Sequence, residues 1–415
     1  MRLMRLKIWT QLLSGLLFVI LGASVAVPSA TTDGRIVLAE GNQSSDDVSQ
    51  LIHEIEAPQE PNRQGLDGMT LQEVMQKFHT QGLSIAVIKD FKIQWAKGYG
   101  VADVQTGRPV ETNTLFQAAS ISKPVTAMAA LRLVQEGRFA LDEDVNKLLK
   151  SWQVPVSDLT RKQPVTPRSL MSHTSGSDDG FGFPGYAPGA PLPKLVQILN
   201  GQPPSNVGPV LFKRPPYQAY KYSGGGIVIE QLMLTDLLGQ PFDQIMQNLI
   251  LKPLGMSDST YQQPLPENLA GRAAHAYDEQ GHAMDAPWHV YPEQAAAGLW
   301  TTPSDLARVA IEVQRAIRGP EGAVLKQSTA REMIAPTGVG PFAIGFEIAK
   351  NGEGWYFSHS GGNWGFACHL LAHVRKGYGV AIMTNGDLGG RVTSEVEARV
   401  AAAYHWDSLD KPLVR

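Results

Sequence analysis

The sequence predicts an α+β protein in which a mainly antiparallel sheet is flanked by helices and carries a helical insertion. Strand-like segments occur towards both ends of the chain, and a largely helical stretch separates them. The strands are expected at residues 83–88, 93–100, 354–357, 366–374 and 379–383. Connections of hairpin length join neighbouring strands within each group, which favours antiparallel pairing.

Helices are predicted where apolar residues recur every three or four positions. The first begins at Leu71 and ends at Gly82, and a longer one starts near Ser120 and is closed by Gly137. Further helices are expected at residues 195–199, 226–238, 304–318 and 393–404. Ser304 is the expected N-cap of the third of these.

Bulk composition describes an ordinary globular chain of 415 residues, with 43% apolar residues and a formal net charge of -3. This charge gives no support for binding nucleic acid through a basic surface. The single cysteine, Cys368, rules out a disulfide within the chain and a multi-cysteine zinc site. We interpret Cys368 as a small residue of the core, and we expect neither a metal nor a cofactor.

The N-terminus has the three parts of a signal peptide: basic residues, an apolar run and small residues around a cleavage site. We assign residues 1–26 to this signal, 27–65 to a linker or N-terminal arm, 66–407 to one catalytic domain and 408–415 to a tail. The expected location is therefore periplasmic or secreted, without stable membrane insertion after cleavage. The oligomeric state is left open.

Ser120 and Lys123 form the first candidate catalytic pair. On a helix, positions i and i+3 share one face, so the hydroxyl and the amine should meet. Serine is a weak nucleophile that needs a base, and lysine serves as one only when burial lowers its pKa from about 10.4. The spacing alone is not specific, because Ser408 and Lys411 repeat it in the tail.

Two further segments carry groups that suit the same chemistry. Tyr222 lies in a glycine-rich turn before a predicted helix, and residues 358–362 read Ser-His-Ser-Gly-Gly after a predicted strand. A single tyrosine is more often a core residue with a satisfied hydroxyl, and a single histidine is more often structural. We assign a structural role to His173, in a loop whose Thr-Ser-Gly sequence is typical of a turn.

Taken together, these segments resemble the class C β-lactamase-like serine hydrolases among the penicillin-recognising enzymes. Ser-x-x-Lys at Ser120, Tyr-Ser at Tyr222 and His-x-Gly at His359 follow one another in the family's order. Supporting segments are His-Thr-Ser-Gly at 173–176, Pro-Leu-Gly-Met at 253–256, Gly-Leu-Trp-Thr-Thr-Pro-Ser-Asp-Leu at 298–306 and Met-Thr-Asn at 383–385. The resemblance covers residues 68–404 and implies a β-lactamase/transpeptidase-like fold with its site between the sheet and a helical subdomain.

The resemblance also implies a role for each matching residue. Ser120 would be acylated, Lys123 and Tyr222 would share the proton transfers, and His359 would stand where other members carry lysine or histidine. The backbone N–H groups of Ser120 and Gly362 would form the oxyanion hole. Gly361 and Gly224 would line the substrate site.

Two departures from the family pattern bear on the substrate. Gly224 replaces the asparagine that often occupies the third position of the Tyr-x-Asn motif, and His359 replaces the lysine of β-lactamases proper. Both changes disfavour efficient β-lactam hydrolysis, because an amide donor and a permanent positive charge are lost.

The expected protein is therefore an exported esterase, amidase or D-amino-acid peptidase acting on a small molecule or peptide. A true β-lactamase or D-Ala-D-Ala carboxypeptidase is the first alternative. A non-catalytic penicillin-binding sensor of wall fragments is the second. The sequence contains neither the Gly-x-Ser-x-Gly elbow of α/β-hydrolases nor a His-Glu-x-x-His zinc motif.

Overall fold

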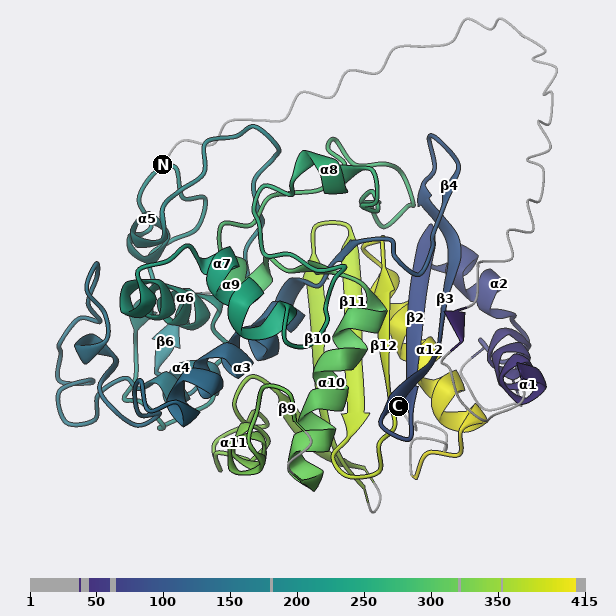
Figure 1. Cartoon of the computed structure of the whole chain (residues 1–415). Helices are drawn as coiled ribbons and strands as arrows, with labels where there is room; N and C mark the ends of the chain where they lie inside the picture. Colours follow the sequence, from purple (N-terminus) through teal and green to yellow (C-terminus); the bar gives the residue numbers. More distant parts are fainter. Residues whose placement is uncertain are drawn as a thin grey trace, which may run out of the picture. The chain divides into compact units, whose positions relative to one another are not determined.

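The central sheet of the computed structural model joins strands from both ends of the chain (Figure 1). The structure describes residues 37–38, 45–59, 65–179, 182–319, 322–351 and 354–407. The strand order is β1 (Val37–Leu38), β3 (Lys92–Asp103), β2 (Gly82–Lys89), β12 (Gly379–Thr384), β11 (Phe366–His373), β10 (Gly354–Asn363) and β9 (Glu347–Asn351), and β4 (Arg108–Pro109) pairs with β3. Every one of these pairs is antiparallel, which confirms the predicted α+β class.

The alternation of side chains along β2 divides the core into two parts. Ile85 and Val87 belong to a cluster with helices α1 (Ser45–Glu56), α2 (Leu71–Lys77) and α12 (Gly389–Ala403). Ala86 and Ile88 belong to the larger cluster on the opposite face, where α10 (Pro303–Arg318) crosses the sheet (Figure 1). The sheet is therefore buried on both faces.

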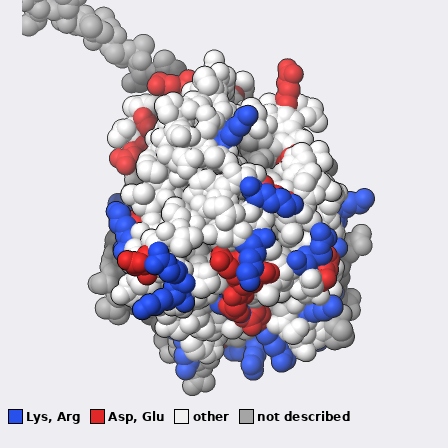
Figure 2. Space-filling model, turned by 90° about the vertical axis from the view of Figure 1, so that its left-hand side faces the viewer, with Lys and Arg blue, Asp and Glu red and all other residues white. Residues whose placement is uncertain are grey.

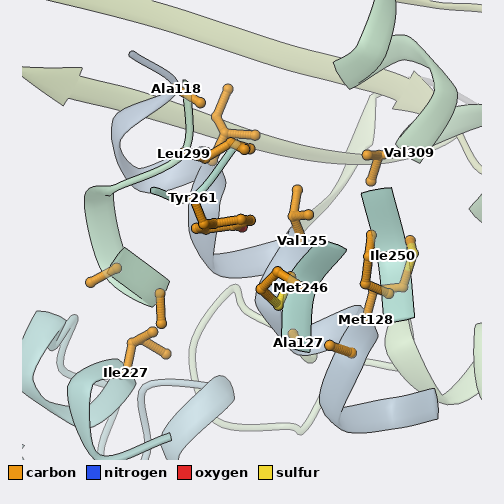
Figure 3. Packing of buried hydrophobic residues seen from close by; sticks show 14 of the residues in the cluster. Ala118, Val125, Ala127, Met128, Ile227, Met246, Ile250, Tyr261, Leu299 and Val309 are labelled. Atoms are coloured by element: carbon orange, nitrogen blue, oxygen red, sulfur yellow. The ribbon is translucent and has the colours of Figure 1, made fainter. Parts of the chain in front are cut away.

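The helical region packs around α3 (Ser122–Gln135), whose side chains are buried over most of its length. Figure 3 shows Val125 and Met128 of this helix among apolar residues from distant segments, including Met246, Ile250 and Tyr261. The longest of the remaining helices in this region is α6 (Gly224–Leu238). The other elements between residues 116 and 333 are β5 (Phe116–Gln117), η1 (Ala119–Ile121), η2 (Val145–Lys147), α4 (Pro167–Met171), β6 (Ser177–Asp178), α5 (Leu195–Asn200), β7 (Leu211–Phe212), α7 (Phe242–Met246), η3 (Gln247–Leu251), α8 (Glu267–Ala270), α9 (Gln294–Ala297), β8 (Trp300–Thr301) and α11 (Gln327–Met333).

The assigned linker, residues 27–65, is partly structured, which corrects the sequence interpretation. β1 pairs with β3, and Val48, Ile52 and Ile55 of α1 are buried against the domain. The polar residues around them masked this apolar stripe. Thr302, rather than Ser304, caps α10, because its hydroxyl accepts the Asp305 N–H at 3.2 Å.

The expected signal segment, residues 1–26, and the tail, residues 408–415, lie outside the described residues. Within the described part of the chain, no helix has the length and apolar character needed to cross a membrane. Figure 2 shows the face of the helical region, where acidic and basic side chains gather together in the lower half and the upper half is largely uncharged.

The helical region contains a buried carboxyl group, Glu230 of α6, that has no hydrogen-bond partner among the described residues. Burial raises the pKa of Glu230 to about 8. The unfolded chain releases this proton near pH 4.5, so the stability of the folded protein falls as the pH rises from there to about 8.

We therefore expect Glu230→Gln to stabilise the protein at pH 8 by a few kcal/mol and to have little effect at pH 5. Urea unfolding at the two pH values measures the difference, with the exposed Glu267→Gln as control. An equal effect of Glu230→Gln at both pH values would contradict a neutral buried acid.

Candidate active site

Ser120 lies in the tight turn η1, immediately before α3. Ala119, which precedes it, has a φ of 47°, a strained conformation for a residue with a side chain. The Ser122 hydroxyl supports this turn, since it donates to the Ala119 carbonyl at 2.6 Å and accepts the Leu299 N–H at 3.0 Å. Ser120 remains partly exposed and can be reached by a substrate.

Lys123 contacts Ser120 as the i, i+3 spacing predicts. Its Nζ donates to Ser120 Oγ at 2.8 Å and to the carbonyl oxygen of Ala296 in α9 at 2.8 Å. The side chain is buried, and this burial lowers the pKa of Lys123 to about 7, although the negative charge of Asp179 opposes the shift. A large fraction of the amine is therefore neutral at physiological pH.

Tyr222 meets the same pair from the loop before α6. Its hydroxyl hydrogen-bonds with Ser120, and Lys123 Nζ lies 5.0 Å from the centre of its ring. Burial raises the pKa of Tyr222 above its ordinary value, and this effect outweighs the hydrogen bond with Ser120. Tyr222 is therefore protonated at rest.

His173 supports the tyrosine loop, in agreement with the structural role expected for it. Its ring lies against that of Tyr222, with centroids 4.3 Å apart. Its Nδ1 accepts the Ser223 N–H at 3.2 Å, and its carbonyl oxygen accepts the Lys221 N–H at 2.9 Å. The segment around His173 thus fixes the residues on both sides of Tyr222.

Asp179 is a site residue that the sequence did not reveal. Its carboxylate accepts the Ser223 hydroxyl and the Gly225 N–H, the latter at 2.5 Å. This places a carboxylate at the N-terminus of α6, close enough to act on Lys123. Burial raises the pKa of Asp179, and its hydrogen bonds with Ser223 and Gly225 oppose that shift. No motif marks Asp179, since it follows the His-Thr-Ser-Gly segment in an irregular loop.

His359 faces the site from β10, and the centroid of its ring lies 6.3 Å from that of Tyr222. Its Nδ1 lies 2.6 Å from the Ser360 carbonyl oxygen, so Nδ1 carries the proton and donates. Burial, together with the charge of Lys123, lowers the pKa of His359 to about 3. His359 is therefore neutral and adds no positive charge. Its Nε2 is buried without a hydrogen-bond partner among the described residues.

Gly361 and Gly362 lie within β10 rather than after a strand, since this strand extends to Asn363. A Cβ on Gly361 would fall 2.3 Å from the Ala118 carbonyl oxygen, so glycine permits the close approach of the turn that carries Ser120 to the strand. A Cβ on Gly362 would meet open space. β9 pairs with β10 only as far as Ser358, so the outer edge at Gly362 has no strand partner there.

Gly224 begins α6, and the space that a side chain would need there is already occupied. A Cβ at this position would fall 2.6 Å from the ring of Phe183. Phe183 therefore stands where the asparagine side chain of the family motif would begin. This replaces a polar surface beside Tyr222 with an aromatic one.

Cys368 is buried, and its Sγ donates to the Ala118 carbonyl oxygen at 2.9 Å. Burial raises the pKa of this thiol, so it does not serve as a nucleophile. In the described part of the chain, no three His, Cys, Asp or Glu side chains come together as metal ligands.

The structure thus brings together Ser120, Lys123, Tyr222 and His359, with Gly361 and Gly362 on the adjoining strand. A serine hydroxyl contacts an amine whose pKa would suit a general base and a phenol that can donate a proton. Such a set can support acyl transfer.

A sequence model of the family described as Beta-lactamase matches residues 69–404. The chain is 26% identical over 326 residues to "Protein flp" of Staphylococcus aureus strain N315, which covers 75% of this chain. The match spans only 61% of that protein's own length.

Solved structures of the same fold include D-amino acid amidase from Ochrobactrum anthropi SV3, with 21% identity and a TM-score of 0.66. A β-lactamase/D-alanine carboxypeptidase from Pseudomonas syringae has 19% identity and a TM-score of 0.64. Each alignment covers 86% of this chain and 98% of the other. At these identities the similarity establishes the fold. The Beta-lactamase family model matches most of the length of this chain. The chain therefore belongs to the Beta-lactamase family, whose members are serine hydrolases.

Proposed function

We propose that the protein is an exported serine hydrolase that cleaves ester or amide bonds through an acyl-enzyme on Ser120. The observation that carries this proposal is the 2.8 Å contact between Ser120 Oγ and a lysine amine whose pKa lies near 7. Export is proposed from the signal-peptide pattern of residues 1–26.

The pKa values suggest a division of labour between the two proton-transfer groups. Lys123 in its neutral form accepts the proton of Ser120 as the hydroxyl oxygen attacks the carbonyl carbon. Tyr222, which keeps its proton at rest, donates to the departing oxygen or nitrogen and recovers a proton from Lys123. Water then attacks the acyl-enzyme by the reverse sequence of transfers.

The oxyanion of the tetrahedral intermediate requires two N–H donors. The backbone N–H of Ser120 and that of Gly362 are proposed for this role. The unpaired outer edge of β10 at Gly362 and the packing of η1 against β10 support the assignment. Each donor in such a site contributes on the order of 3 kcal/mol.

The charges around the site favour a substrate other than a β-lactam. A β-lactam presents a carboxylate, which is recognised best by a permanent cation. Here His359 is neutral, and Asp179 places a negative charge close to the catalytic groups. Phe183 beside Gly224 adds an apolar wall. We therefore propose neutral or positively charged esters and amides, including D-amino-acid derivatives, as the substrate class.

A panel of p-nitrophenyl acetate, a D-amino-acid amide, a D-alanyl peptide and nitrocefin tests this proposal. We expect turnover of an ester or a D-amide, with nitrocefin the slowest substrate. Fastest turnover of nitrocefin would instead identify a β-lactamase. Labelling by a fluorescent penicillin without turnover of any substrate would identify the sensor.

A further inference from the structure

A cavity of about 540 Å³ lies at the C-terminal end of α10, and no residue of the candidate active site lines it. Arg318 of α10, Arg331 of α11 and Arg375 of the turn between β11 and β12 surround it, and all three are exposed. Figure 1 shows α11 beside the C-terminal half of α10. The axis of α10 measures about 22 Å from its first turn to its last.

The floor of the cavity is apolar and fixed in place. Ile317 and Val374 line it, and both are buried. Gln314, also in the lining, donates from Nε2 to the carbonyl oxygens of His373 and Tyr378, at 2.7 and 3.0 Å. These bonds attach the turn between β11 and β12 to α10, so the elements that line the cavity are tied to each other.

The side chain of Arg318 and the backbone of Arg375 are also restrained. The guanidinium of Arg318 lies 4.7 Å from the centre of the Phe91 ring. The backbone N–H of Arg375 donates to Nδ1 of His373 at 2.9 Å. The contact with Phe91 lowers the entropy that the Arg318 side chain loses when a ligand binds.

Neighbouring carboxylates are engaged with other cations. Glu332, next to Arg331, pairs with Arg168. Asp407 pairs with Lys376 at 2.5 Å. Over the residues that the structure describes, no ion pair engages Arg318, Arg331 or Arg375.

A purely structural explanation accounts for part of this arrangement. Arg318 and Arg331 lie in the last turns of their helices, where a cation offsets the helix dipole. Arg375 lies in a turn between strands and has no such role. All three arginines line one cavity, and the helix dipoles account for only two of them.

We propose that this cavity binds an organic anion, a compound that carries a phosphate or carboxylate group on an apolar body. The three guanidinium groups hold the anionic oxygens through charge-assisted hydrogen bonds. The apolar part rests on Ile317 and Val374. Phosphate and carboxylate share this chemistry, and the experiment distinguishes them.

Calorimetric titration of the purified protein with phenyl phosphate, and separately with phenylacetate, tests the proposal. We expect at least one probe to bind with a Kd of about 1 mM or tighter at low ionic strength. Inorganic phosphate, which lacks the apolar body, should bind more weakly than phenyl phosphate. The stronger of the two aryl probes identifies the preferred anion.

A triple variant that combines Arg318→Gln, Arg331→Gln and Arg375→Gln should weaken binding of the aryl probe about tenfold or more. A matched control removes three exposed positive charges elsewhere, at Lys77, Arg138 and Lys162, and should change the Kd less than about twofold. Circular dichroism verifies the fold of both, and the single change Arg331→Gln provides a milder variant. The proposal is overturned if neither aryl probe binds, or if both triple variants weaken binding equally.

Discussion

Replacing Ser120 by alanine is expected to lower kcat/KM for p-nitrophenyl acetate by about four orders of magnitude or more. The change removes the oxygen that receives the acyl group, so no covalent route remains. Ser120 is only partly buried, and its turn is held by Ser122 and Leu299 rather than by its own hydroxyl. The fold should therefore survive the substitution.

Ester hydrolysis and mass spectrometry of the protein after treatment with a fluorophosphonate measure this effect. The wild type should gain one adduct that maps to Ser120, and Ser120→Ala should lose it. The control Ser394→Ala changes an exposed serine of α12 and should retain full activity. Full activity of Ser120→Ala would remove Ser120 from the mechanism.

The second large effect is expected from Lys123→Met, which keeps the apolar stem of the side chain but removes the amine. Acylation should slow by about two to four orders of magnitude, the usual contribution of a general base. Stopped-flow release of p-nitrophenol measures the acylation rate. The control is Lys221→Met, which removes an exposed lysine next to Tyr222 and leaves the amine that contacts Ser120 intact. Unchanged acylation in Lys123→Met would assign the base elsewhere.

The pH dependence of the wild type reports on the same amine. Because only neutral Lys123 accepts a proton, kcat/KM should rise as the pH approaches about 7 and level off above it. The pKa values of His359 and His173 are both lowered far below 7, so neither ring produces this limb. The carboxylate of Asp179 raises the pKa of Lys123, so Asp179→Asn should lower that pKa. The rise of kcat/KM with pH should then occur at lower pH in this variant.

Local sequence patterns were sufficient to predict one contact of the candidate site and part of the sheet. The helical spacing of Ser120 and Lys123 fixes their contact within one turn, and the alternation of apolar residues places β2 and β3 in the sheet. The antiparallel class followed from the short connections. The prediction that Tyr222 lies beside Ser120 and Lys123 came from the resemblance, because no local pattern relates residues a hundred positions apart.

What the sequence did not reveal depends on tertiary contacts. Asp179 and Phe183 enter the site from irregular loops whose path is set by packing. α1 buries only Val48, Ile52 and Ile55, and the polar residues around them are typical of a linker. The continuation of β10 through His359 to Asn363 was missed because glycine and serine are poor strand formers, whereas pairing with β11 maintains the strand.

The pairing of β2 with β12 has a consequence for how the chain acquires its structure. Ile85 lies opposite Ile382, almost three hundred residues later in the chain. A ribosome must therefore complete nearly the whole polypeptide before the middle of the sheet can close, and so many intervening residues impose a large loop-closure entropy on this step. Until then β2 lacks its neighbouring strand β12, and the nascent protein is exposed to aggregation or to capture by chaperones.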